Sequence, residues 1–154
     1  MSVPPIRLLE QPRYEFHYDL TVRVNQLDYG HHLSHDSIIG MAHEARALMF
    51  HSLGVEENNL GDNRTGVIIG DLAVGYHGEA GLFDTLRIDT HIGELGRSNF
   101  RVFQRIMREG SLIALVETGT IAFDYAARAI VPIPEVFRKA LKQHLLRQAP
   151  NSNI

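Results

Sequence analysis

The segment Leu27–Arg46 reads LDYGHHLSHDSIIGMAHEAR and joins a polar loop to the start of an apolar helix. The loop holds one carboxylate, Asp28, and three histidines, His31, His32 and His35. The start of a helix offers unpaired backbone N–H groups and a positive dipole end, which stabilise oxyanions and carbonyl oxygens. A carboxylate just upstream can serve as base or nucleophile on such a carbonyl. The segment therefore predicts acyl-transfer or hydrolysis chemistry.

The helix itself is expected to run from about residue 36 to residue 53, with Gly54 as its C-terminal cap. Its first turn is polar, but further along, apolar residues cover most of the circumference. Such a helix is buried on several sides. The apolar residues are Ile38, Ile39, Met41, Ala42, Ala45, Leu48, Met49 and Leu53.

The rest of the chain has the patterns of strands. Before the loop, apolar Phe16, Tyr18, Leu20, Val22 and Val24 alternate with polar residues, as in a half-buried strand. After the helix, strands are expected at roughly 66–77, 84–95, 98–109 and 112–125, and the short turn-rich breaks between them predict antiparallel hairpins. A second helix is expected at about 135–147, with Pro134 at its first position.

This order of elements predicts an α+β fold, in which a curved antiparallel sheet surrounds one long central helix and a C-terminal helix follows. The length of 154 residues suits one domain. We expect an extended N-terminal arm over residues 1–13, a single domain over 14–147 and a flexible tail over 148–154.

Composition excludes several classes of function. The net charge of −3 and the absence of a basic block argue against binding to nucleic acid. The chain has no cysteine, which excludes disulfides, a thiol nucleophile and thiolate metal sites. No apolar run approaches the roughly 18 residues of a membrane helix, and the N-terminus is too polar for a signal peptide. We therefore expect a soluble cytoplasmic protein with no membrane insertion.

Four segments carry a family likeness: VNQLDYGHH at 24–32, HEAR at 43–46, a Tyr…Asp hairpin at 75–84 and DYAARAIVPIP at 124–134. In order and spacing they resemble the hotdog-fold acyl-CoA thioesterases of the 4-hydroxybenzoyl-CoA thioesterase-like group, over roughly residues 14–138. The chain departs from the family pattern at two glycines. Where most relatives have a glycine three residues after the aspartate, this chain has His31, and Phe83 replaces a glycine of the hairpin.

The resemblance implies a hotdog fold and hydrolysis of an acyl-CoA, or of an acyl-carrier-protein thioester. It implies that Asp28 attacks the thioester carbonyl or activates a water; the alternative is that Asp28 only caps a turn before Gly30. It implies no cofactor apart from the coenzyme A of the substrate, and no metal. It also implies a homodimer or homotetramer with active sites between subunits.

Further residues are candidates for the oxyanion and substrate sites. We expect the backbone N–H groups of Ser34, His35 and Asp36 to hold the carbonyl oxygen, although Ser34 or Asp36 also suits an ordinary helix N-cap. His31 and His32 are expected to line the acyl pocket. Together with His35 and nearby carboxylates these histidines offer enough ligands for zinc. Consecutive histidines point apart, however, and we predict no metal site.

Glu44 is the rival to Asp28, because some hotdog thioesterases take their catalytic carboxylate from the central helix. Its alternative is a buried glutamate paired with Arg46 or with a group on a strand. Ser98 and Asn99 fall where relatives carry a polar turn near the acyl site, and hairpin turn chemistry explains them equally well. The arginines at 97, 101, 105 and 128 are candidates to meet the phosphates of coenzyme A.

Two other functions remain open. A hydratase or dehydratase of the same fold needs a histidine with a carboxylate, which His32 or His35 could supply with Asp28, but the expected Asp-x-Asn-x-x-His pattern is missing. A non-catalytic acyl-CoA-binding hotdog protein is the other alternative. The displaced glycine and Phe83 keep this alternative open.

Overall fold

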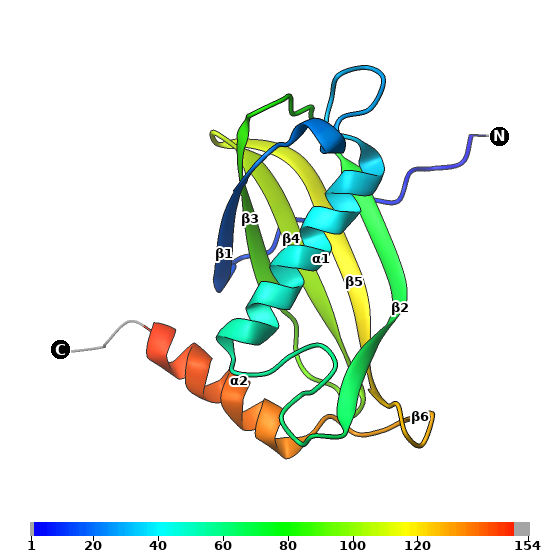
Figure 1. The fold of residues 1–154 in the computed structure, drawn as a ribbon, viewed down its shortest axis with the longest axis vertical. Helices are drawn as coiled ribbons and strands as arrows, with labels where there is room; N and C mark the ends of the chain where they lie inside the picture. Colours follow the sequence, from blue (N-terminus) through cyan, green and yellow to red (C-terminus); the bar gives the residue numbers. More distant parts are fainter. Residues whose placement is uncertain (1, 150–154) are drawn as a thin grey trace.

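Six strands form one antiparallel sheet around a long helix in the computed structural model, which describes residues 2–149 (Figure 1). The predicted α+β architecture is confirmed. The strands lie in the order β1-β3-β4-β5-β2, and β6 pairs with β5. The strands are β1 (Phe16–Thr21), β2 (Thr65–Tyr76), β3 (Thr85–Ile92), β4 (Asn99–Arg108), β5 (Ser111–Asp124) and β6 (Ala129–Ile130); the helices are the 3-10 turn η1 (Val24–Gln26), α1 (His35–Ser52) and α2 (Glu135–Gln148).

The first strand is shorter than its alternating sequence predicts. Strand β1 ends at Thr21, and Val24, expected to face inward, lies in η1 with 67% of its surface exposed. The Gln26 side chain accepts a hydrogen bond from the backbone N–H of Arg23, which closes a turn at that point. This local side-chain contact competes with the strand and ends it.

The connection between β2 and β3 is not the hairpin that its short length suggested. Strand β2 pairs with β5 at one edge of the sheet, whereas β3 lies between β1 and β4. The linking residues 77–84 cross three strand spacings of about 4.8 Å each, a distance that eight extended residues can cover. The other two breaks, between β3 and β4 and between β4 and β5, are antiparallel hairpins as predicted.

Helix α1 buries one face in the concave side of the sheet and leaves the other open (Figure 1). The buried face packs as two clusters, one around Met41 and Ala45 and the other around Phe50, which also contacts Phe137 of α2. On the open face Leu48 is 40% exposed. The prediction that the helix is buried on several sides is therefore wrong for the single chain, since the sheet covers only one side.

The described N-terminal residues form an extended arm, whereas the C-terminal helix packs on the core. Residues 2–15 belong to no helix or strand, while α2 begins directly after its N-cap Pro134 and ends at Gln148. Most of the predicted tail, residues 150–154, lies outside the described residues. Within residues 2–149, no helix is both long and apolar enough to cross a membrane.

The concave face carries three buried polar atoms that find no hydrogen-bond partner within residues 2–149: Gln104 Oε1, Thr118 Oγ1 and Thr120 Oγ1. A buried hydroxyl without a partner keeps its desolvation cost and gains nothing in return. Thr90, on the neighbouring β3, differs because its Oγ1 accepts a hydrogen bond of 3.2 Å from Gln104 Nε2.

We predict that Thr118→Val raises the free energy of unfolding by about 1 kcal/mol, because a methyl group replaces an unpaired hydroxyl of the same size. The matched variant Thr90→Val should lower it by about 1 kcal/mol, because it removes a bonded hydroxyl. Urea unfolding followed by circular dichroism measures both. A destabilised Thr118→Val protein would contradict the assignment of an unpaired hydroxyl.

Candidate active site

Asp28 is held in a tight loop between η1 and α1. Its Oδ1 accepts hydrogen bonds from the backbone N–H of Gly30 at 2.8 Å and of His32 at 3.2 Å. The backbone N–H of Asp28 donates a hydrogen bond of 2.8 Å to the carbonyl of His32, which closes the loop. Asp28 therefore does cap the turn before Gly30. Its second oxygen, Oδ2, accepts no hydrogen bond from residues 2–149, so capping leaves one carboxylate oxygen free.

The start of α1 has two free backbone donors, fewer than predicted. The Ser34 N–H donates to the carbonyl of Gln26 at 2.8 Å, and the Ser34 side chain caps the helix by accepting from the N–H of Ser37. Within the described chain the N–H groups of His35 and Asp36 bond to no other residue, although the Asp36 carboxylate lies close to its own N–H. The expected oxyanion donors are thus reduced to these two amides.

A pocket of about 210 Å³ joins the Asp28 loop to the start of α1 and the end of β2. Its eight lining residues are Asp28, His32, Leu33, His35, Ile38, Tyr76, Gly78 and Glu79. Three of the predicted site residues, Asp28, His32 and His35, therefore meet in one place. His31, Ser34 and Asp36 do not line it.

Two side chains of the pocket add polar groups that the Asp28 motif did not indicate. The His32 ring lies 3.3 Å from a carboxylate oxygen of Glu79, and Glu79 was not predicted because it sits in the loop that crosses from β2 to β3. The Tyr76 hydroxyl points to the carbonyl of His35, 3.5 Å away. Burial, and secondarily the negative charge of Asp36, raises the pKa of Tyr76, so its hydroxyl is protonated at neutral pH.

The rival carboxylate, Glu44, lies apart from this pocket. It is exposed, and its Oε2 accepts a hydrogen bond of 3.0 Å from the hydroxyl of Tyr18 on β1. The expected burial of Glu44 was wrong, because Glu44 projects from the side of α1 that the sheet leaves open. The expectation that a group on a strand pairs with it is confirmed by the contact with Tyr18. Arg46 is buried instead and pairs with Glu57 at 3.2 Å.

Ser98 and Asn99 do not join the Asp28 pocket within one chain. Strand β4 begins at Asn99 and ends at Arg108, which donates a hydrogen bond to the carbonyl of Glu79 beside the pocket. Ten strand residues place the two ends about 30 Å apart. Ser98 and Asn99 instead form the β3–β4 turn, where the Asn99 carbonyl accepts from the N–H of Gly96 at 2.8 Å. Within one chain these two residues therefore lie outside the Asp28 pocket, and their part in a site between subunits stays a prediction.

The sequence also raised the questions of a metal site and of arginines that bind the phosphates of coenzyme A. Among residues 2–149, no group of three or more His, Asp or Glu side chains is arranged to hold a metal ion. Of the candidate arginines, Arg101 bridges Asp71 and Glu117, and Arg105 pairs with Asp89. Both therefore have carboxylate partners on the convex face, remote from the start of α1.

Comparison with known proteins assigns the family. The sequence profile of the Thioesterase-like superfamily matches residues 22–141. The chain belongs to this superfamily. A search of curated proteins finds no significant match.

Solved structures show the same fold at low sequence identity. A 1,4-dihydroxy-2-naphthoyl-CoA thioesterase from Synechocystis has 18% identity and a TM-score of 0.75, over 82% of this chain and 95% of that one. A gentisyl-coenzyme A thioesterase has 22% identity and a TM-score of 0.72, over 80% and 98%. A Staphylococcus aureus protein in complex with CoA has 18% identity and a TM-score of 0.76, over 87% and 85%. The predicted hotdog fold is thereby confirmed.

The two departures from the expected glycine pattern of the thioesterases share one backbone feature. His31 has a φ of 63° and Phe83 a φ of 65°, both in the left-handed region that favours glycine. The backbone at these positions therefore has the shape that glycine would adopt, although the side chains differ. The displaced Gly30 does not signal a rearranged loop.

We predict that Phe83→Gly is more stable than Phe83→Ala by about 1 kcal/mol, because only alanine keeps the left-handed strain. Phe83 is 68% exposed, so either variant loses little packing. Leu82, the exposed neighbour without a positive φ, is the matched control, and there alanine should be the more stable by about 0.5–1 kcal/mol. Equal stability of the two Phe83 variants, measured by thermal unfolding, would argue against the strained conformation.

Proposed function

We propose that this protein hydrolyses an acyl-CoA thioester at the Asp28 pocket. The observation that carries the proposal is the meeting of a carboxylate with a free oxygen, Asp28, and the unbonded amides at the start of α1 beside one pocket. The family assignment supports thioester hydrolysis in general. Coenzyme A as the carrier is favoured by the neighbour solved with CoA, and an acyl-carrier-protein thioester is the alternative. A cytoplasmic location belongs to the same proposal.

In this mechanism the thioester oxygen accepts hydrogen bonds from the N–H groups of His35 and Asp36. Removing one such donor typically costs a hundred- to a thousandfold in rate. In the nucleophilic route, Asp28 Oδ2 adds to the carbonyl carbon, the C–S bond breaks, coenzyme A leaves as a thiolate, and water hydrolyses the mixed anhydride. In the general-base route, Oδ2 takes a proton from the water that attacks. Both routes use the same free oxygen.

The pocket is too small to enclose the substrate by itself. Ligand pockets usually measure about 300–1,000 Å³, whereas this one has about 210 Å³. One wall is formed by Tyr76, at the end of β2, and β2 is an open edge of the sheet. The missing walls are therefore expected to come from a second subunit.

We extend the proposal to a homodimer formed through β2, with a tetramer of two such dimers as the larger alternative. Strand β2 has 12 residues and leaves the backbone groups of one side unpaired, whereas the other edge strand, β1, has six. Along β2, the inward-facing Ile69, Leu72 and Tyr76 are 44%, 42% and 51% exposed. Unpaired edges with exposed apolar residues favour pairing between chains.

A hydratase or dehydratase remains the second candidate, because the pocket holds a histidine–carboxylate pair. The His32 ring and Glu79 are 3.3 Å apart, which is the combination that such chemistry requires. Hydration of 2-enoyl-CoA and release of coenzyme A, assayed on the same preparation, distinguish the two reactions. Enoyl-CoA hydration without coenzyme A release would select the hydratase.

We predict that Asp28→Asn lowers kcat for coenzyme A release at least a hundredfold with little change in thermal stability. The asparagine oxygen can still accept from the amides of Gly30 and His32, but the free position no longer carries a carboxylate. The chain has no cysteine, so a thiol reagent measures released coenzyme A without reacting with the protein. The matched control, Asp19→Asn on the exposed outer side of β1, should keep the wild-type rate.

A panel of acyl-CoA substrates, assayed with wild type and Asp28→Asn together, gives the decisive outcomes. If Asp28→Asn keeps most of the wild-type rate on the best substrate, the assignment of Asp28 is wrong, and Glu44→Gln is the next variant. Tight binding of acyl-CoA without turnover, across several chain lengths, would replace the enzyme by a binding protein.

A further inference from the structure

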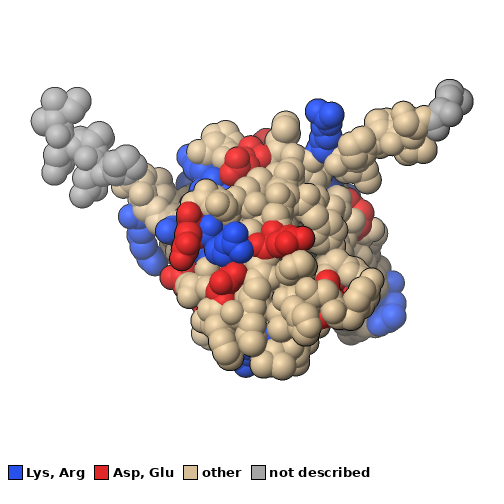
Figure 2. Space-filling model, turned by 90° about the horizontal axis from the view of Figure 1, so that it is seen from above, with Lys and Arg blue, Asp and Glu red and all other residues tan. Residues whose placement is uncertain are grey.

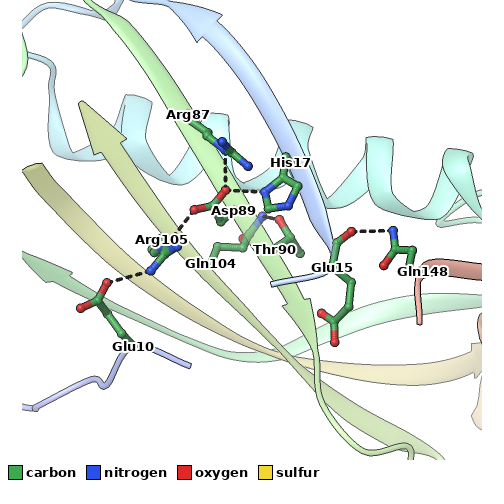
Figure 3. Close-up of polar contacts among 9 residues, drawn as sticks. All are labelled: Glu10, Glu15, His17, Arg87, Asp89, Thr90, Gln104, Arg105 and Gln148. Carbon is green, nitrogen blue, oxygen red and sulfur yellow. Dashed lines mark hydrogen bonds and ion pairs between the residues drawn. The ribbon is translucent and has the colours of Figure 1, made fainter. Parts of the chain in front are cut away.

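The N-terminal arm, defined here as residues 2–14, crosses the convex face of the sheet and continues beyond the edge strand β2 (Figure 1). Two contacts anchor its inner half. The Glu10 carboxylate accepts a hydrogen bond of 3.1 Å from Arg105, and the Arg105 guanidinium lies 4.3 Å from the centre of the Tyr14 ring. Arg105 also pairs with the buried Asp89, which His17 and Arg87 contact as well (Figure 3). The inner arm is thus tied to a rigid part of the sheet.

The outer half of the arm has no such support. Residues 2–9 make no hydrogen bond with the described sheet or helices, and the arm projects from the body when seen from above (Figure 2). Its apolar Val3, Ile6 and Leu9 are 91%, 79% and 77% exposed. A groove of about 730 Å³ separates residues 5–9 from Val74–His77 at the end of β2. The arm therefore passes over the open edge and presents apolar side chains past it.

The arm sequence determines what kind of surface it fits. Residues 3–9 read VPPIRLL, and the two prolines lack the N–H groups needed to add a strand to a sheet. They favour polyproline II conformation, which binds by packing on exposed aromatic rings. The binding surface that suits the arm is thus an aromatic surface beside a strand edge.

The chain carries such a surface at the other end of β2. The rings of Phe123 and Tyr125 pack edge to face with centres 5.2 Å apart, and Tyr125, 44% exposed, donates a hydrogen bond to the carbonyl of Val67. Tyr125 covers Gly66 so closely that a Cβ there would lie 2.8 Å from its ring. We call Phe123 and Tyr125 the aromatic shelf.

The arm does not reach the shelf of its own chain. The arm leaves the sheet beside Val74–His77, and the shelf lies beside Gly66, at least eight strand residues or about 26 Å away. A two-fold pairing of β2 with itself, centred on its middle, brings residues 74–77 opposite residues 64–67 of the second copy. The shelf of that copy then lies next to the arm, within the roughly 25 Å that residues 2–9 span in polyproline II conformation.

We propose that the N-terminal arm of each subunit docks on the aromatic shelf of a second copy of this chain. On the convex side, each docked arm adds contacts between the two subunits to those made by the paired β2 strands. The proposal rests on the β2-paired dimer of the proposed function but not on hydrolysis. Hydrolytic activity is therefore no readout of its test.

Disulfide trapping tests the contact directly, because the chain has no cysteine of its own. Ile6→Cys and Ala126→Cys proteins are mixed, allowed to exchange subunits and oxidised mildly; Ala126 is exposed and adjoins the shelf, so both aromatic rings stay in place. We expect an interchain disulfide between the two variants on a non-reducing gel. The control mixture, Ile6→Cys with Ser111→Cys at the exposed β4–β5 turn, should give none. Equal cross-linking in both mixtures would overturn the proposal.

Deletion of residues 2–9 tests the energetic contribution and leaves the Glu10 and Tyr14 anchors in place. We expect the dissociation constant of the dimer, measured by sedimentation equilibrium, to rise at least tenfold while circular dichroism stays unchanged. Tyr125→Ala should weaken the full-length dimer similarly and have little further effect in the deleted protein. A dissociation constant changed less than twofold by the deletion, or a wild type that is monomeric throughout, would refute the docking.

Discussion

Helix α1 buries one of its faces along its 18 residues, and a sheet that curves around it provides the surface for this burial. In antiparallel strands every second side chain points inward and contributes to this surface. In β4, for example, the inward-pointing Phe100, Val102 and Ile106 are fully buried. The same packing fixes the direction of the helix. Its N-terminus lies against the end of β2, so the free amides of His35 and Asp36 are placed by the core and not by the loop that precedes them.

The elements of the fold were readable in the sequence because each depends on a local period. Alternation identified the first strand, turn-rich breaks delimited the later ones, and apolar residues at helical spacing identified the C-terminal helix. Pairing between strands is not local in this way. Strand β2 pairs with β5, some fifty residues later, because residues 77–84 cross the end of the sheet. A side-chain contact of Gln26 likewise ended β1 before Val24, although the alternation continued.

The sequence predicted those residues of the candidate site that are close together along the chain. It did not predict the residues that only the pairing of strands brings to the pocket. Asp28, His32 and His35 lie within eight residues, and the turn that Asp28 caps brings them to one pocket. Glu79 reaches the same pocket only because the crossing loop passes there, which no spacing reveals. Asn99 does not reach this pocket within one chain, because the hairpin that contains it lies at the far end of β4.

The pocket, the open edge and the arm are connected through the last residues of β2. Tyr76 lines the Asp28 pocket, contacts the first carbonyl of α1 and borders the groove beneath the arm. A partner that pairs with β2 therefore changes a wall of the pocket and fills the groove in the same step. The left-handed backbone at His31 and Phe83 is held by hydrogen bonds within the chain, from the N–H of each residue to the carbonyls of Asp28 and Val22 respectively. The Asp28 turn is thus fixed within the chain, whereas in the proposed dimer the Tyr76 wall also depends on pairing through β2, so the proposed association and the proposed catalysis would share this edge strand.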